Sequence, residues 1–261
     1  MSGVNKVFLD KLNMNLIKKL AAVAFALLFL PSLLSCAPSS PSPNSLDPLS
    51  AGVSAIDTPI SASTQVSLSK TELKTRQAAV KIITPRGHGS GAYILLEGYH
   101  VVFTAAHVVK GGKRFLVIDH AGNKRVGTLV YTQENVDFAI LLIPEFKGIT
   151  PMEFSLADFN PAKSMGKELL FSGFPAGQSL RTVRSSISGI EGKRFVLHST
   201  AWGGSSGSCV FDSKGNFVGI VFAITLSSFN NAPVLLESMV WVEPYSEIDW
   251  VSVKKFIRSL N

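Results

Sequence analysis

The sequence predicts an all-β fold, a sandwich or barrel of short strands followed by one C-terminal helix. Three observations lead to this prediction. Short apolar segments recur between residues 80 and 242, clusters of Gly, Asn and Pro separate them, and helical periodicity appears only near the C-terminus. The chain has 261 residues and 46% apolar content, so it is long enough to bury a substantial core.

The expected strands form two sets, divided near residue 150. The strands of the first set are Val80–Ile83, Ala92–Leu96, Val101–Thr104, Phe115–Ile118, Thr128–Tyr131 and Phe138–Ile143. Those of the second are Glu168–Ser172, Val183–Ile190, Arg194–His198, Ser208–Phe211, Phe217–Ile224 and Met239–Val242. Turn signals at Gly111-Gly112, Gly122-Asn123, Gly173-Phe174-Pro175 and Lys214-Gly215-Asn216 separate them. Strands packed this densely favour a sandwich or barrel over βαβ units.

A single long helix is expected from about Ser246 to Leu260. Five apolar residues can share one broad face, and basic residues occupy the last turns. The five are Ile248, Val251, Val253, Ile257 and Leu260.

Residues 1–35 have the pattern of a secretory signal peptide. Lys18-Lys19 precede an apolar run from Leu20 to Leu30, which is too short to span a bilayer comfortably. Counting from Met14 instead of Met1 gives a signal of ordinary length. An anchor that is never cleaved is the alternative.

Cys36 follows Leu33-Leu34-Ser35, a run that resembles the bacterial lipobox. There the cysteine is lipidated and becomes the mature N-terminus, which would tether the protein to a membrane. Leu34 is a less usual residue at its position, and a plain signal peptide with an incidental cysteine stays open. The expected location is exported, periplasmic or at the cell surface, with a lipid anchor in a bacterial membrane.

Residues 36–69 are rich in Ser, Pro, Thr and Ala and nearly free of aromatic residues. Such a composition buries too little apolar surface to offset the entropy of ordering. We expect a flexible linker here and a folded domain from 70 to 261.

Charge and cysteine content argue against several functional classes. Of the net charge of +7, +3 lies in the first 35 residues, and the remaining basic residues are scattered, so nucleic-acid binding is not expected. If Cys36 carries lipid, Cys209 is the only other thiol and no internal disulfide can form. Five scattered histidines without ligand spacing predict no metal site, and no cofactor is expected.

Three motifs, which contain His107, Asp137 and Ser206 in that order, supply the candidate catalytic residues. A serine hydroxyl becomes a useful nucleophile when a neutral imidazole removes its proton. His107 follows the strand-like segment 101–104, and Asp137 precedes the apolar segment 138–143. A buried carboxylate there is costly unless a histidine N–H pairs with it. Each residue alone would be read as structural; together they predict a catalytic triad.

Ser206 lies in Gly203-Gly204-Ser205-Ser206-Gly207-Ser208, the most specific of the three motifs. The glycines let backbone N–H groups turn inward, so we expect the N–H groups of Gly204 and Ser206 to form an oxyanion hole. A flexible Gly/Ser loop is the alternative reading.

From about Gln77 to Leu260 the chain resembles bacterial chymotrypsin-like (trypsin-fold) serine proteases, and it is nearest to the compact Deg/HtrA-type and glutamyl-endopeptidase-type proteins. The resemblance rests on the three motifs above and on further segments. These are Gly89–Ile94, Ser172–Pro175, Ile187–Gly189 and the block from Gly203 to Val221. It implies two antiparallel six-stranded β-barrels, a C-terminal helix and a triad in the cleft between the barrels. It also implies hydrolysis of polypeptide substrates through an acyl-enzyme. We expect no PDZ domain, since few residues follow Ser206 in this sequence.

The departures from the family pattern concern specificity. Cys209 stands where proline is usual, and Ser208 replaces the second glycine, as in the glutamyl-specific branch. Val221 occupies the position of the histidine that binds glutamate in that branch. The expected specificity pocket contains Thr200, Val221, Phe222 and Ala223, without an acidic residue, and should accept a small or apolar side chain.

The resulting hypothesis is a secreted or membrane-tethered serine endopeptidase. Three alternatives stay open: a catalytically silent binding module of the same fold, a cysteine protease using Cys209, and a structural lipoprotein.

Overall fold

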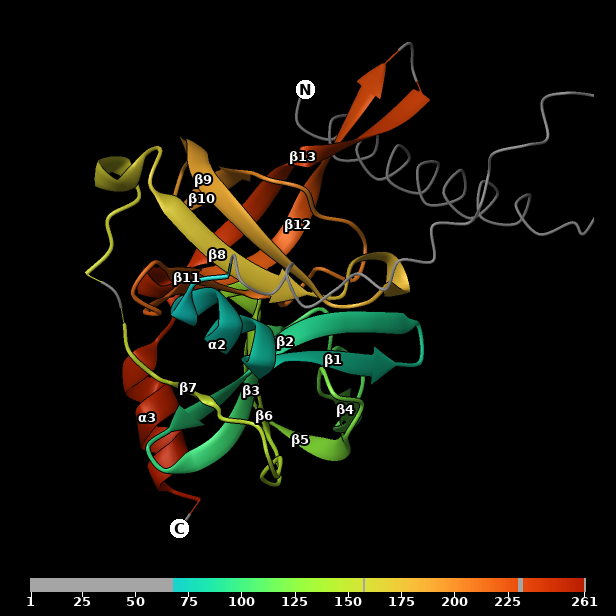
Figure 1. Cartoon of the computed structure of the whole chain (residues 1–261), viewed down its shortest axis with the longest axis vertical. Helices are drawn as coiled ribbons and strands as arrows, with labels where there is room; N and C mark the ends of the chain where they lie inside the picture. The colour runs from blue at the N-terminus through green and yellow to red at the C-terminus, as the bar shows by residue number, and fades with distance from the viewer. Residues whose placement is uncertain (1–67, 157, 230–231, 261) are drawn as a thin grey trace, which may run out of the picture. The chain divides into compact units, whose positions relative to one another are not determined.

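A computed structural model describes residues 68–156, 158–229 and 232–260. The signal peptide, Cys36 and nearly all of the linker lie outside these residues. The first barrel is a sheet in the order β1-β4-β5-β6-β3-β2, closed by antiparallel pairing of β1 with β2, and β7 adds parallel to β2 (Figure 1). The barrel strands are β1 (Ala79–Thr84), β2 (Gly87–Leu96), β3 (Tyr99–Ala105), β4 (Arg114–Ile118), β5 (Lys124–Gln133) and β6 (Phe138–Leu142). The added strand β7 (Met152–Glu153) lies outside the closed barrel.

The second barrel is closed in the order β10-β13-β12-β11-β8-β9, with antiparallel neighbours throughout. Its strands are β8 (Glu168–Gly173), β9 (Arg181–Glu191), β10 (Arg194–His198), β11 (Cys209–Asp212), β12 (Phe217–Phe229) and β13 (Ala232–Pro244). Two closed six-stranded antiparallel barrels confirm the predicted chymotrypsin-like fold class. Closure gives each of the six strands of a barrel two neighbours, which leaves little exposed sheet edge.

A shared aromatic core joins the two barrels. Phe103 of β3 packs edge-on against Phe138 of β6 and against Phe217 of β12, with ring centroids 5.3 and 5.6 Å apart. Helix α3 (Trp250–Arg258) covers this core with Trp250, Val253 and Ile257. Each fully buried large apolar side chain contributes about 1.5–3 kcal/mol, so this cluster holds the two barrels together.

The C-terminal helix was predicted correctly in place and too long in extent. Its first residues form the 3₁₀ turn η5 (Tyr245–Glu247), and Asp249 caps α3 by accepting a hydrogen bond from Ser252 N. Val251 is 80% exposed, so its assignment to the apolar face was wrong. At 100° per residue, Val251 lies about 200° from Val253 and faces away from the core.

A second helix, α2 (Lys70–Ala78), was not anticipated. Ser69 caps it through a capping box with Glu72, and the helix contacts β8 and β9 of the second barrel as well as β2 of the first (Figure 1). Glu72 is buried and pairs with Arg184 of β9, and Arg76 Nη1 donates to Leu180 O at 3.2 Å. The helix therefore links the start of the domain to both barrels.

Among the described residues, no helix has the length and apolar character needed to cross a bilayer.

Candidate active site

His107 is held by both oxygens of one carboxylate. It follows β3 in a short turn in which Val108 N donates to Ala105 O and Val109 N to Ala106 O. Asp137 Oδ2 lies 2.6 Å from His107 Nδ1, and Asp137 Oδ1 accepts from the His107 backbone N–H at 2.8 Å. The carboxylate sets the ring orientation and keeps the Nδ1 proton, leaving Nε2 free to accept another. The imidazole remains 46% exposed.

The backbone of Asp137 explains how this carboxylate reaches His107. Asp137 ends the 3₁₀ turn η2 (Glu134–Val136) in the left-handed region, with φ of 48° and ψ of 41°. Aspartate tolerates this conformation better than most residues do. Strand β6 begins at the next residue and pairs with β3, and Ala106 N donates to Asp137 O at 3.0 Å. The two residues, thirty positions apart, therefore meet where paired strands end.

Ser206 lies on the loop between β10 and β11 and lines the same pocket as His107. The pocket has a volume of about 580 Å³. Within the described chain, His107 Nε2 and Ser206 Oγ form no hydrogen bond with each other. Nucleophile–base hydrogen bonds are often long in ligand-free structures and shorten when substrate binds.

The N–H groups of Gly204 and Ser206, on either side of Ser205, are available to an acceptor from outside the protein. Ala176 N donates to Gly203 O at 2.6 Å, so the trans peptide places the Gly204 N–H on the opposite side. Gly204 has φ of +98°, a conformation that favours glycine. In the part of the chain that the structure describes, the N–H groups of Gly204 and Ser206 have no hydrogen-bond partner. They are free to bind an anionic oxygen.

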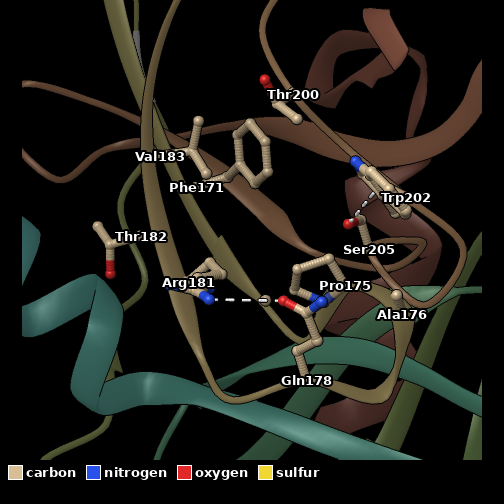
Figure 2. Close-up of a pocket in the computed structure, with 11 residues that line it drawn as sticks. Phe171, Pro175, Ala176, Gln178, Arg181, Thr182, Val183, Thr200, Trp202 and Ser205 are labelled. Carbon is tan, nitrogen blue, oxygen red and sulfur yellow. Dashed lines mark hydrogen bonds between the residues drawn. The ribbon is translucent and has the colours of Figure 1, made fainter. Parts of the chain in front are cut away.

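A second pocket, of about 330 Å³, is lined in part by Trp202 and Ser205 of the same loop. Figure 2 shows Phe171 and Val183 on one wall and Trp202 across from them, with Trp202 N donating to Ser205 Oγ at 3.3 Å. Thr200 also lines this pocket, whereas Ser206 and His107 do not. Its walls contain no carboxylate.

The other three residues of the expected specificity pocket do not line this cavity with Thr200. Val221 is buried in the second barrel and pairs with Val242. The guanidinium carbon of Arg194 lies 4.5 Å from the centroid of the Phe222 ring, over its face. Ala223 is half-buried on β12.

Cys209 starts β11 and is buried against the first barrel. Its Sγ lies 3.9 Å from Phe103 O, and burial raises the pKa of the thiol above its usual range. A neutral, enclosed thiol is a poor nucleophile.

The trypsin-like peptidase domain family matches residues 89–220, a segment that spans His107, Asp137 and Ser206. The chain belongs to the trypsin-like peptidase family. Its class is therefore that of a serine endopeptidase, a hydrolase.

Solved structures of peptidases share this fold. The Rv3671c protease of M. tuberculosis in its active form is 22% identical with a TM-score of 0.58, and the match covers 85% of this chain and 94% of that one. The HtrA-type protease AlgW with tripeptide is 20% identical with a TM-score of 0.58, over 72% of this chain and 63% of that one. The serine endoprotease from Yersinia pestis is 19% identical with a TM-score of 0.56, over 72% of this chain and 65% of that one. This trypsin-like chain thus spans less than two thirds of the AlgW and Yersinia chains. No curated protein matches.

Two residues of this trypsin-like site were not predicted as functional. His88 lines the pocket of His107 and Ser206, and its Nε2 lies 2.8 Å from Phe174 O. Ser90 N donates to Ser206 O at 2.8 Å. The Gly89-Ser90-Gly91 motif was visible in the sequence, but only as part of a strand. The described residues contain no group of His, Cys, Asp or Glu suited to a metal ion.

Proposed function

We propose that Ser206 is the nucleophile, His107 the general base and Asp137 the residue that orients it, in an endopeptidase that works through an acyl-enzyme. One observation carries this assignment. His107, fixed by two hydrogen bonds that it donates to Asp137, lines the same pocket as Ser206, whose own N–H and that of Gly204 are free in the described chain.

Each group has a defined part in the reaction. His107 Nε2 takes the proton from Ser206 Oγ as the oxygen attacks the peptide carbonyl carbon. The carbonyl oxygen becomes anionic and accepts hydrogen bonds from Gly204 N–H and Ser206 N–H. His107 then gives the proton to the departing amine, which leaves an ester on Ser206. Water, deprotonated by His107, attacks that ester, and the carboxylic acid product leaves as Oγ recovers the proton.

The test compares cleavage of a proteome-derived peptide mixture by the wild type, by Ser206→Ala and by a matched neighbour, Ser208→Ala. Ser208 is fully buried, and its Oγ has no hydrogen-bond partner in the described chain, so its removal costs little. We expect cleavage by the wild type and Ser208→Ala and none by Ser206→Ala. Cleavage that survives in Ser206→Ala would refute the assignment.

The same experiment addresses the silent binding module. A wild-type protein that is folded, cleaves no peptide and does not react with a fluorophosphonate would support a binding role instead. The presence of all three chemical groups and of free N–H donors favours the enzyme.

We also propose export and lipid attachment at Cys36, because the apolar run is typical of a signal peptide and Leu-Leu-Ser-Cys resembles the bacterial lipobox. A tether through the 36–69 segment would let the peptidase act on polypeptides near a membrane surface. Mass spectrometry of the mature N-terminus should show an acylated Cys36; an unmodified N-terminus would refute the anchor.

The preference for a small or apolar side chain before the cleaved bond stays a prediction. The cleavage sites in the peptide mixture measure it directly, and a majority of acidic residues at that position would contradict it.

A further inference from the structure

Ser90 holds the nucleophile loop at two carbonyl groups. Its backbone N–H donates to Ser206 O at 2.8 Å, and its Oγ donates to Gly204 O at 2.7 Å. The N–H groups of these same two residues, Gly204 and Ser206, have no partner in the described chain. One residue of β2 in the first barrel is therefore bonded to both residues of the oxyanion hole in the second.

The side chain of Ser90 is itself fixed from two directions. Phe174 N donates a hydrogen bond to Ser90 Oγ at 2.9 Å. The Ser90 hydroxyl in turn donates its own hydrogen to Gly204 O. Thr104 Oγ1 donates to Ser90 O at 2.7 Å. Ser90 has no exposed surface, and its hydroxyl has one orientation available.

Peptide planarity transmits this contact along the loop. Because Gly204 C=O points at Ser90, the N–H of Ser205 points away, and it donates to Trp202 O at 2.9 Å. Because Ser206 C=O points at Ser90, the N–H of Gly207 also points away and donates to Val221 O at 2.8 Å. The peptide unit that carries the Ser206 N–H lies between these two fixed units.

We propose that the Ser90 hydroxyl is a positioning residue that orients the two N–H donors of the oxyanion hole. The proposal rests on the function proposed above. Without the hydroxyl, Gly204 O and Phe174 N lose a shared partner in a buried place, and the Gly204–Ser205 peptide gains freedom to rotate. The donors would then be misplaced when the anionic oxygen forms.

The test measures acylation and turnover with p-nitrophenyl acetate, an activated ester that does not depend on a specificity pocket, and with a peptide that the wild type cleaves. Ser90→Ala removes the hydroxyl, and Ser90→Cys replaces it with a group of similar shape that hydrogen-bonds weakly. Ser185→Ala is the matched control, since Ser185 is also buried and its Oγ donates to the strand carbonyl Leu169 O at 3.2 Å, in a sheet position outside the loop.

We expect kcat to fall at least tenfold in both Ser90 variants, toward the roughly 10²-fold loss that follows removal of one oxyanion donor, with KM changed less than about threefold. Ser185→Ala should keep kcat within about twofold while losing a similar amount of thermal stability, on the order of one buried hydrogen bond. A structural role alone would lower the stability of all three variants and leave kcat unchanged, and this result would overturn the proposal.

Two further outcomes are decisive. A Ser90→Cys protein with wild-type kcat beside a slow Ser90→Ala would show that volume rather than hydrogen bonding matters, which contradicts the proposal. A wild-type protein that fails to acylate at Ser206 would refute the proposed function itself, whereas an active wild type with unaffected Ser90 variants would refute only the role of Ser90.

Discussion

Asp137 binds His107 at both its ring and its backbone, with Oδ2 on Nδ1 at 2.6 Å and Oδ1 on the main-chain N–H at 2.8 Å. The second contact fixes the position of the residue, and the first fixes the rotation of its ring. Both are available because Asp137 ends a 3₁₀ turn in a left-handed conformation just before β6. The pair is the best-defined part of the proposed triad.

Asp137→Asn should lower kcat by about 10³–10⁴-fold with little effect on folding, because the amide favours the wrong imidazole tautomer. Asparagine also tolerates the left-handed backbone at φ of 48°. Steady-state kinetics on the cleaved peptide and urea unfolding measure the two effects. A loss of kcat below tenfold would show that the carboxylate does not serve His107.

Gly207→Ala should destabilise the fold by about 3 kcal/mol and abolish activity, since it combines positive φ with a collision. At φ of +89°, a Cβ there would run into Ser90 O and Thr104 Oγ1. Gly192→Ala is the control: its φ is +62° and a Cβ meets nothing within 4 Å. It should cost only about 1 kcal/mol and keep full activity. Equal unfolding free energies for the two variants would contradict this account of the loop.

The Glu72 carboxylate makes the free energy of unfolding depend on pH in the acidic range. The hydrogen bonds from Arg184 lower the pKa of the buried Glu72 carboxyl from its ordinary value of 4.5 to about 2. A depressed folded-state pKa stabilises the fold above the unfolded pKa, and this contribution is lost as pH falls from about 5 toward 2.

Glu72→Gln should therefore lower the free energy of unfolding at pH 7 by about 2 kcal/mol. This is less than the whole change in pKa would give, because Arg184 is half exposed and solvent screens its charge. The difference from the wild type should shrink as the pH falls toward 3. Glu97→Gln, which breaks the more exposed pair with Arg258, should change stability by less than about 1 kcal/mol. Urea unfolding across this pH range measures both, and a difference that does not vary with pH would contradict the assigned pKa.

Cys209→Ala should retain the wild-type kcat and lose about 1 kcal/mol of stability from the small cavity. The buried thiol has a raised pKa, so iodoacetamide should leave the native enzyme active. Inactivation of the wild type by iodoacetamide, together with resistance of the variant, would instead indicate that Cys209 is the nucleophile.

The barrels and the His107, Asp137 and Ser206 motifs could be predicted because their signals are local. Short apolar strands with glycine-rich turns reveal the fold class, and each motif is contiguous in sequence. The structure then brings His107 and Asp137 together through the pairing of β3 with β6.

Helix α2 could not be predicted in this way. Its buried residues are Glu72, Thr75 and Ala78, so the helix carries little apolar periodicity. Glu72 is buried because Arg184, 112 residues away, pairs with it. Ser90 was missed for a similar reason: its partners Phe174 and Gly204 come from distant segments that only the tertiary structure places beside β2.

In the proposed mechanism Ser206 is an activated nucleophile, and a fluorophosphonate reagent labels such a serine covalently, so the site of the adduct identifies it. Native protein is treated with the reagent, digested and sequenced by mass spectrometry, with heat-denatured protein as the control. We predict a single adduct on Ser206, formed only in the native protein and lost in Asp137→Asn at short reaction times. A native protein that carries no adduct, or carries it on Ser205 or Ser208 instead, would show that Ser206 is not the nucleophile.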